Sequence, residues 1–238
     1  MHCRKVAGSS IAATLAPHLG SDDLHLGTWP EALAVGVAPN RRARRVSYFG
    51  RLLRKPRRLA EQKYRVAALN GAQRMKYRTA LGASPEHAHA RCVRDFDPGA
   101  WRDYFKFAFV RNPYDRAVSD FHWRTRKTGR TDLDFDDFLA RMQARDFRDG
   151  VVPRHFDNWP IYTIDDRIAV DFVGRFESLA DDLAQVFDRI GLPAPRLPHA
   201  KSSKPRRPTA SWYGDTQRAR VESLFGREIR AFDYAFPA

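Results

Sequence analysis

Cysteine is scarce in this sequence, and the common metal-ligand spacings are missing. Among its 238 residues only Cys3 and Cys92 are cysteines, too few for a disulfide framework. Neither C-x-x-C nor H-E-x-x-H occurs, so no metal site is indicated. We therefore expect a fold that depends on its apolar core and chemistry that needs no metal ion.

Long apolar segments are missing as well. No run approaches the roughly 18 apolar residues that a membrane-spanning helix needs. Residues 1–20 lack the apolar segment of a signal peptide. These absences predict a soluble, intracellular protein without a transmembrane segment.

Acidic residues are few relative to basic ones. The chain has 42 Lys and Arg against 28 Asp and Glu, a net charge of +14. Such a chain attracts polyanions, among them nucleic acids, anionic glycans and nucleotide cofactors. Residues 41–66 are strongly basic, and we interpret them as an insertion or connector. The alternative is a surface that holds a polyanionic partner. Pro56 should break any single long helix there.

Apolar runs and helical patterns alternate along the rest of the chain. Residues 105–110 (FKFAFV) and 168–173 predict buried strands, whereas residues 20–40 are turn-rich. Helices are predicted at 9–19, 115–126, 134–145, 178–190 and 215–232. The alternation predicts an α/β fold with a sheet flanked by helices. We expect one domain over residues 1–238, with a loop rich in proline and basic residues at 193–212.

The first motif with chemical content is RKVAGSSI, residues 4–11. A small turn that runs into a helix presents free backbone N–H groups, and together with the helix dipole these bind phosphate or sulfate. Lys5 can reach the same anion as a point charge, and Ser9 and Ser10 can add hydroxyl donors. The pattern GxxxxGK[ST] is absent, so this is not a Walker loop. A basic N-terminal string without a ligand is the alternative.

The second motif is FAFVRNPYDRAVSDF, residues 107–121. A buried strand delivers Arg111 at its carboxyl end, the edge at which open α/β sheets bind ligands. Ser119 lies one to two turns into the next helix. Arg111 and Ser119 are therefore predicted to converge on one phosphate. The alternative is a structural ion pair of Arg111 with Asp115 or Asp120.

Together the two motifs resemble those of the family 2, carbohydrate-type sulfotransferases. The resemblance continues through DFVGRFESL (171–179) and FDYAF (232–236). It implies a P-loop nucleotide-kinase-like parallel sheet flanked by helices. It also implies transfer of a sulfuryl group, without a metal, from 3′-phosphoadenosine 5′-phosphosulfate (PAPS) to a hydroxyl of a carbohydrate or glycan. We expect a cytoplasmic bacterial enzyme whose partner is this acceptor, with an anionic polysaccharide as one candidate, and no specific nucleic acid.

The resemblance also assigns roles to individual residues. Lys5 would be catalytic, holding the bridge between phosphate and sulfate, while Arg111 and Ser119 would bind the 3′-phosphate. Lys201 and Lys204 would belong to a lid over the cofactor. The 5′-phosphosulfate loop would comprise Arg4, Lys5, Ala7, Gly8, Ser9 and Ser10.

One departure from the family pattern lies at the N-terminus. The family usually has an apolar strand before the loop and a proline before the lysine. Here only Met1 to Cys3 precede Arg4, which stands in the proline's place. We therefore expect the first strand of the sheet to be truncated in the chain as given, which would be costly for neighbouring backbone groups.

The residue that takes the acceptor's proton is sought in EHAHARCV, residues 86–93, where the family often shows a histidine. A histidine near its ordinary pKa suits base catalysis at neutral pH. His87 fits the family position best, and the alternatives are His89, Glu86 and His155. His155 and Asn158 lie in RHFDNWP, where the family places acceptor-side residues.

Other assignments remain open at this point. Glu177 is interpreted as structural, paired with Arg175 or Arg111. The whole chain could instead be a nucleic-acid-binding protein, given its charge, although it shows no recognisable binding motif. A kinase-like transferase or an inactive sulfotransferase-like member are further alternatives.

Overall fold

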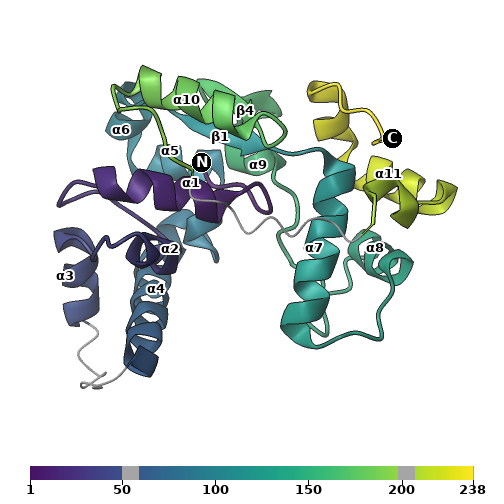
Figure 1. Cartoon of the computed structure of the whole chain (residues 1–238), viewed down its shortest axis with the longest axis horizontal. Coiled ribbons are helices and arrows are strands. Elements are labelled where there is room, and N and C mark those ends of the chain that lie inside the picture. The colour runs from purple at the N-terminus through teal and green to yellow at the C-terminus, as the bar shows by residue number, and fades with distance from the viewer. Residues whose placement is uncertain (50–58, 198–206, 238) are drawn as a thin grey trace.

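The computed structural model describes residues 1–49, 59–197 and 207–237 (Figure 1). It is an α/β structure in which helices surround a small parallel sheet. The helices are α1 (Gly8–Leu15), α2 (Trp29–Ala34), α3 (Arg41–Phe49), α4 (Leu59–Leu81), α5 (Ala90–Phe96), α6 (Pro98–Asp103), α7 (Pro113–Thr128), α8 (Phe135–Gln143), α9 (Trp159–Tyr162), α10 (Leu179–Arg189) and α11 (Asp215–Ala231). The strands are β1 (Phe107–Val110), β2 (Thr163–Ile164), β3 (Arg167–Ile168) and β4 (Phe172–Arg175). Short 3₁₀ turns are η1 (Ala16–His18), η2 (Pro85–His87) and η3 (Thr209–Trp212).

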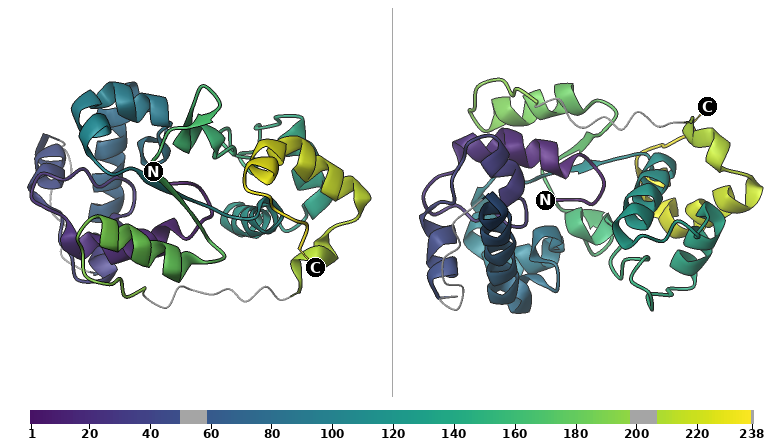
Figure 2. Two further views of the ribbon diagram at one scale, coloured as in Figure 1. Left: turned by 90° about the horizontal axis from the view of Figure 1, so that it is seen from above. Right: turned by 60° about the horizontal axis from the view of Figure 1, so that its bottom comes forward.

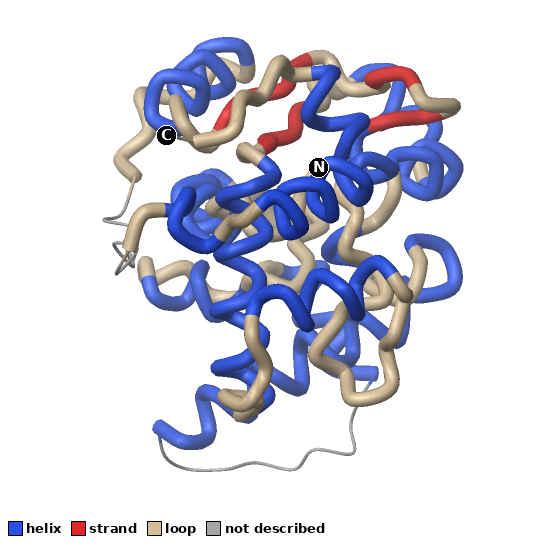
Figure 3. The backbone as a smooth tube through the Cα atoms, turned by 90° about the vertical axis from the view of Figure 1, so that its right-hand side faces the viewer, coloured by secondary structure: helices blue, strands red, loops and turns tan. Residues whose placement is uncertain are grey.

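The parallel pair β1 and β4 forms the sheet beside which the candidate site lies. Phe107 is in register with Phe172 and Val110 with Arg175. Ala108, Phe109 and Val110 are at most 2% exposed, as expected for a strand covered on both faces. This confirms the strand predicted at 105–110. Figure 3 shows the strands gathered toward one side of the molecule, with most helices beneath them.

The second predicted strand was wrong in its bounds. Within residues 168–173, Ile168 belongs to β3, which pairs antiparallel with β2. The parallel strand begins only at Phe172, because the backbone N–H groups of Asp171 and Phe172 bond to the carbonyl of Lys106 and set the register. Pairing with a distant strand, and not the local apolar run, decides where β4 starts.

Residues 1–3 lie along the other edge of β1. The carbonyls of Lys106 and Val110 accept from β4 and the residue after it, so the intervening carbonyl of Phe107 faces the opposite edge. There it accepts a hydrogen bond from the amino group of Met1. Cys3 is 1% exposed and belongs to the apolar core around the sheet. Residues 1–3 form no regular strand, but they lead Arg4 and Lys5 to the carboxyl end of β1.

The described residues form four apolar clusters, and the two smaller ones lie among η1, α2, α3 and α4 and around α3, α4 and Ala88. Of the two larger clusters, one contains the sheet together with α9 and α10, and the other lies between α7, α8 and α11. Figures 1 and 2 show α7, α8 and α11 gathered at one end of the molecule and α1 to α4 at the other. The helices predicted at 9–19, 115–126, 134–145, 178–190 and 215–232 are confirmed to within a few residues.

Helix α2 lies inside residues 20–40, which the sequence had predicted only as turn-rich. Its indole residue Trp29 is fully buried, and Trp29 Nε1 donates to Gln73 Oε1 at 3.0 Å. The basic segment 41–66 contributes α3 and the start of α4, which lie side by side (Figure 1). Pro56 lies outside the described residues. None of the helices that the structure describes is both long and apolar enough to cross a membrane.

Candidate active site

The loop at residues 4–8 has an unusual backbone. Lys5 and Ala7 have φ angles of 63° and 59°, in the left-handed region that non-glycine residues rarely adopt. Helix α1 begins directly afterwards, and its first intrahelical bond runs from Ile11 N to Ala7 O at 3.0 Å. The N–H groups at the start of α1 therefore lack intrahelical acceptors. Such a turn at a helix N-terminus forms a concave set of donors suited to an anion.

Gly8 lies against the side chain of His2. A Cβ atom on Gly8 would lie 1.8 Å from Nε2 of His2, so the imidazole ring of His2 fills the space beside the loop. The backbone of Gly8 therefore packs against the imidazole ring of His2, which precedes the loop.

Asn158 clamps the loop from the other side. Arg4 N donates to Asn158 Oδ1 at 2.9 Å, and Asn158 Nδ2 donates to Arg4 O at 3.0 Å. Asn158 is 1% exposed, at the start of α9. The sequence placed Asn158 on the acceptor side, whereas in the structure its amide holds the backbone of the loop. Nε of Arg4 is buried without a hydrogen-bond partner in the described part of the chain.

Arg111 lies where β1 ends, with its guanidinium 4.2 Å from the ring centroid of Phe176. Its Nε is buried, and no described residue accepts a hydrogen bond from it. Burial lowers the pKa of Arg111, while Asp115 and Glu177 oppose that shift. A desolvated guanidinium with an unpaired donor is the feature expected of a site that awaits an anion.

The predicted structural partners of Arg111 are engaged elsewhere. Asp115 accepts a hydrogen bond from the hydroxyl of Thr209, and Asp120 pairs with Arg124 at 3.4 Å. The alternative of an ion pair between Arg111 and either carboxylate is therefore wrong within the described residues. Their side chains are closer to other donors.

Glu177 differs from its predicted pairing in the same way. Its carboxylate accepts from the backbone N–H of Asn112 at 2.7 Å and from the hydroxyl of Tyr234 at 3.3 Å. Arg175 instead donates to the carbonyl of Phe232. Glu177 therefore caps the turn after β1 and makes no ion pair with Arg175 or Arg111 in the described part of the chain.

Lys5 lies in the electrostatic field of Arg111. Burial lowers the pKa of Lys5, and Asp120 opposes that shift. Arg111, Arg124 and Arg126 lower it further. Lys5 Nζ is 5.1 Å from the ring centroid of Trp123 in α7. The structure thus brings the loop lysine and the strand-end arginine into one cationic region.

The serines occupy different environments. Ser119 is half-buried in α7. Ser9 Oγ donates to Glu31 Oε1 at 2.8 Å, so its hydroxyl already has an acceptor in α2. The carbonyl of Ser10 accepts from the hydroxyl of Thr14 at 2.9 Å. Lys201 and Lys204 lie outside the described residues.

His87 packs against the residues that lead into the loop. Its ring centroid is 4.6 Å from that of His2, and His87 Nδ1 is 2.8 Å from the carbonyl oxygen of His2. A carbonyl only accepts, so Nδ1 carries the proton and Nε2 keeps its lone pair. Burial, followed by the charge of Arg4, lowers the pKa of His87 to about 4. At neutral pH the ring is therefore uncharged and the lone pair of Nε2 is available. The sequence predicted a histidine near its ordinary pKa, and burial makes His87 a weaker base than that.

The alternative bases are arranged differently. Glu86 forms an ion pair with Arg74, which keeps its carboxylate occupied. His89 and His155 form a pair with ring centroids 6.4 Å apart. Burial, followed by the charge of His155, lowers the pKa of His89. Among these four candidates, His87 is the one whose ring nitrogen is held by a hydrogen bond to the backbone just before the loop, at the carbonyl of His2.

The lowered pKa of His87 predicts a pH-dependent stability. The unfolded chain binds the proton at the ordinary pKa of 6.5, whereas the folded chain binds it only near about 4. The free energy of unfolding is therefore unaffected by His87 above about pH 6.5. Between pH 6.5 and about 4 it decreases, by up to about 3 kcal/mol for this residue. We expect His87→Asn, which keeps a donor for the His2 carbonyl, to lose less stability than the wild type between these two pH values.

Urea denaturation at pH 7.5, 5.5 and 4.5 measures this difference. Near pH 7.5 the two proteins should have similar midpoints, which serves as the internal control. Parallel loss of stability in both proteins over the acidic window would show that His87 does not titrate as its burial demands.

Sequence reasoning missed several residues of the site. Lys5 approaches the ring of Trp123 in α7, Arg124 lies over the same ring, and Asp120 lines a small cavity together with Arg4 and Lys5. A signal for Trp123 existed, because it stands four residues after Ser119 and must share its helix face. The buried pair Arg116 and Glu228 gave no such signal, since their contact joins α7 to α11 across the fold.

Comparison with known proteins identifies the family. Residues 69–235 match the family described as "Sulfotransferase family" (Sulfotransfer_2), and the chain belongs to this family. The match contains Arg111 and Ser119 and begins after the loop at residues 4–8. An uncharacterized protein of Archaeoglobus fulgidus is 33% identical over 90 residues, which cover 38% of this chain and 70% of that protein. No solved structure matches the chain.

Family membership supports sulfuryl transfer from a sulfate donor to an acceptor as the general activity. Within residues 1–49, 59–197 and 207–237, no cluster of histidine, cysteine and acidic residues could hold a metal ion. The cationic side chains described above are the groups available there to neutralise charge.

Proposed function

We propose that this protein is a PAPS-dependent sulfotransferase that sulfates a hydroxyl of a carbohydrate or glycan. In this proposal residues 1–238 form one domain related to the P-loop nucleotide kinases. The observation that carries it is Arg111, a desolvated guanidinium with an unpaired Nε at the carboxyl end of β1. It shares this edge of the sheet with an anion-binding turn that carries Lys5.

Different residues of the site bind the two phosphate groups of the donor. The backbone N–H groups at the start of α1 bind the 5′-phosphate, and Lys5 donates to the oxygen that bridges phosphorus and sulfur. Arg111 and Ser119 bind the 3′-phosphate, the group that distinguishes PAPS from ATP and ADP.

The transfer step balances with these groups in place. The acceptor hydroxyl oxygen forms a bond to sulfur while the bond from sulfur to the bridging oxygen breaks. The hydroxyl proton passes to Nε2 of His87, and the electron pair of the broken bond stays on the departing 3′-phosphoadenosine 5′-phosphate (PAP). Lys5 stabilises the charge that develops on that oxygen, as cationic groups do in phosphoryl transfer.

Titration calorimetry with PAP tests the donor site. We expect PAP to bind at least about tenfold more tightly than ADP, because charge-assisted contacts to the 3′-phosphate contribute about 1.5–3 kcal/mol. Arg111→Ala should remove that preference and leave PAP and ADP with similar affinities.

Arg175→Ala is the matched control, because Arg175 ends the neighbouring strand β4 and stacks on Tyr234 instead. It should keep the preference for PAP. Equal affinities for PAP and ADP in the folded wild-type protein would contradict the proposal.

A further inference from the structure

The turn at residues 4–8 is held in a backbone conformation that its residues do not favour. Lys5 and Ala7 both carry a Cβ atom, yet their φ angles are 63° and 59°. Left-handed backbone is unfavourable for such residues and persists only where the surrounding structure holds it. These two residues also set the direction of the chain as it enters α1. A contact that stabilises the turn therefore prepares the anion site.

Asn158 provides such a contact, because its amide binds both polar backbone groups of Arg4. Arg4 N donates to Asn158 Oδ1 at 2.9 Å, and Asn158 Nδ2 donates to Arg4 O at 3.0 Å. No other side chain among the described residues forms a hydrogen bond to the backbone of residues 4–7.

The bond to the carbonyl of Arg4 also directs the next N–H group. In a planar trans peptide the carbonyl of one residue and the N–H of the following residue point in opposite directions. With the carbonyl of Arg4 held on Asn158, the N–H of Lys5 therefore points away from Asn158. No residue that the structure describes accepts a hydrogen bond from it. Asn158 thus leaves the N–H of Lys5 free to bind an anion.

The N–H group in this clamp is present because residue 4 is an arginine. A proline, which the family usually has at this place, lacks the N–H and restricts φ by its ring instead. An arginine places no such restriction on its own backbone. The two hydrogen bonds of Asn158 therefore restrict the backbone at a position where the side chain of Arg4 does not.

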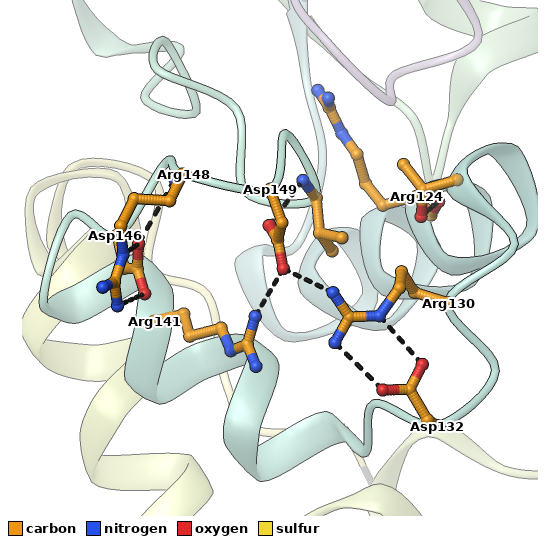
Figure 4. A network of polar contacts seen from close by, with 9 residues as sticks. Arg124, Arg130, Asp132, Arg141, Asp146, Arg148 and Asp149 are labelled. Atoms are coloured by element: carbon orange, nitrogen blue, oxygen red, sulfur yellow. Dashed lines mark hydrogen bonds and ion pairs between the residues drawn. The ribbon is translucent and has the colours of Figure 1, made fainter.

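Asn158 is well anchored itself. It is 1% exposed and lies in the connection between α8 and α9. Earlier in that connection, the carboxylate of Asp149 binds both Arg130 and Arg141 (Figure 4). Directly after Asn158, α9 enters the apolar core, where Tyr162 is fully buried. The amide therefore has a firm support from which to hold the loop.

We propose that Asn158 is a positioning residue of the donor site, which holds the turn at residues 4–8 in its anion-binding conformation before the donor arrives. It acts through the backbone of Arg4 and Lys5 and does not touch the donor. This inference rests on the proposed function. When a binding-competent conformation is populated only in part, the apparent affinity falls by that fraction. Loss of Asn158 should therefore weaken ligands that use the loop and spare ligands that use only the Arg111 side.

Titration calorimetry with two nucleotides tests this inference. PAP carries both phosphates, whereas adenosine 3′-monophosphate lacks the 5′-phosphate that the loop would bind. We expect Asn158→Ala to weaken PAP at least about tenfold and to change the affinity for adenosine 3′-monophosphate less than about twofold. Asn158→Leu removes the same hydrogen bonds but keeps a similar volume, so it should give the same result if the alanine variant folds poorly.

A second substitution in the loop distinguishes positioning from general support. Glycine adopts a positive φ as readily as a negative one, so Ala7→Gly lowers the cost of the turn. The double variant Asn158→Ala with Ala7→Gly should bind PAP at least about threefold more tightly than Asn158→Ala alone. A residue that only supports the fold would not be rescued in this way.

Asn40→Ala is the matched control. Asn40 Nδ2 donates to Gly20 O at 2.8 Å and Asn40 Oδ1 accepts from Ala43 N at 3.0 Å, so this amide also bridges backbone groups, but beside α3. The control should bind both nucleotides like the wild type.

Three results would overturn the inference alone: Asn158→Ala binds PAP like the wild type, it weakens both nucleotides by the same factor, or Ala7→Gly recovers no affinity. A wild-type protein that binds PAP no better than ADP would overturn the proposed function and this inference with it.

Discussion

Lys5→Ala is expected to lower the rate of sulfate transfer about a thousandfold, while the affinity for PAP changes less than tenfold. Lys5 is partly desolvated, and burial lowers its pKa, so its charge acts with little screening by water. In the proposed mechanism, the charge on the bridging oxygen that Lys5 contacts develops only as the bond to sulfur breaks. Removing one such donor typically costs about 10²–10³ in rate. Steady-state kinetics with PAPS and a saccharide acceptor, together with calorimetry for PAP, separate the two effects.

Lys76→Ala provides the matched control for this experiment. Lys76 is an exposed lysine in α4 that contacts Tyr77 and not the loop. Its removal should leave both rate and affinity unchanged. A Lys5→Ala protein that transfers sulfate at more than a tenth of the wild-type rate would remove Lys5 from the proposed chemistry.

Glu228→Ala is expected to destabilise the protein by about 3–5 kcal/mol. Glu228 forms a buried ion pair with Arg116, and both side chains are at most 5% exposed. The hydroxyl of Tyr162 donates to Glu228 Oε1 at 2.7 Å. Burial raises the pKa of Glu228, whereas Arg116 counteracts that shift and favours the carboxylate. Without the carboxylate, the guanidinium of Arg116 stays buried with the carbonyl of Phe156 as its one remaining acceptor among the described residues.

Urea denaturation measures this loss, with Glu222→Ala as the control in the same helix. Glu222 is about half exposed, binds Arg218 at 3.0 Å and accepts from Tyr114. Exposed pairs contribute about 0–1 kcal/mol, so the control should lose about 1 kcal/mol. If the two variants lost the same stability, the buried contacts of Glu228 with Arg116 and Tyr162 would not stabilise the packing of α7, α9 and α11 more than a surface ion pair does.

Local patterns in the sequence predicted much of the fold. The apolar run FKFAFV predicted β1, and the helix predicted at 115–126 matches α7 except for two residues at each end. Two elements could not be found in this way. The start of β4 depends on hydrogen bonds to Lys106, and α2 is stabilised by the bond between Trp29 and Gln73, 44 residues apart in sequence. Contacts between distant segments leave no local periodicity to read.

The candidate site shows the same division. Lys5, His87 and Arg111 were chosen from short motifs. In the structure Lys5 lies in the electrostatic field of Arg111, and His87 packs against His2, which precedes the loop. The clamp of Asn158 on Arg4 and the engagement of Glu177 with Asn112 could not be predicted, because both depend on how loops from separate elements meet. A charged side chain in a sequence also does not reveal which of several nearby groups it binds. Asp115 was a candidate partner of Arg111, but in the structure it accepts a hydrogen bond from Thr209.

A crystal structure of the protein with PAP tests the central claim most directly. The account predicts the 5′-phosphate within hydrogen-bond distance of the backbone N–H groups of Gly8 and Ser9. It predicts the 3′-phosphate against the guanidinium of Arg111 and the hydroxyl of Ser119. PAP bound away from the loop, or with Arg111 still without a phosphate partner, would contradict the assignment of this region as the donor site.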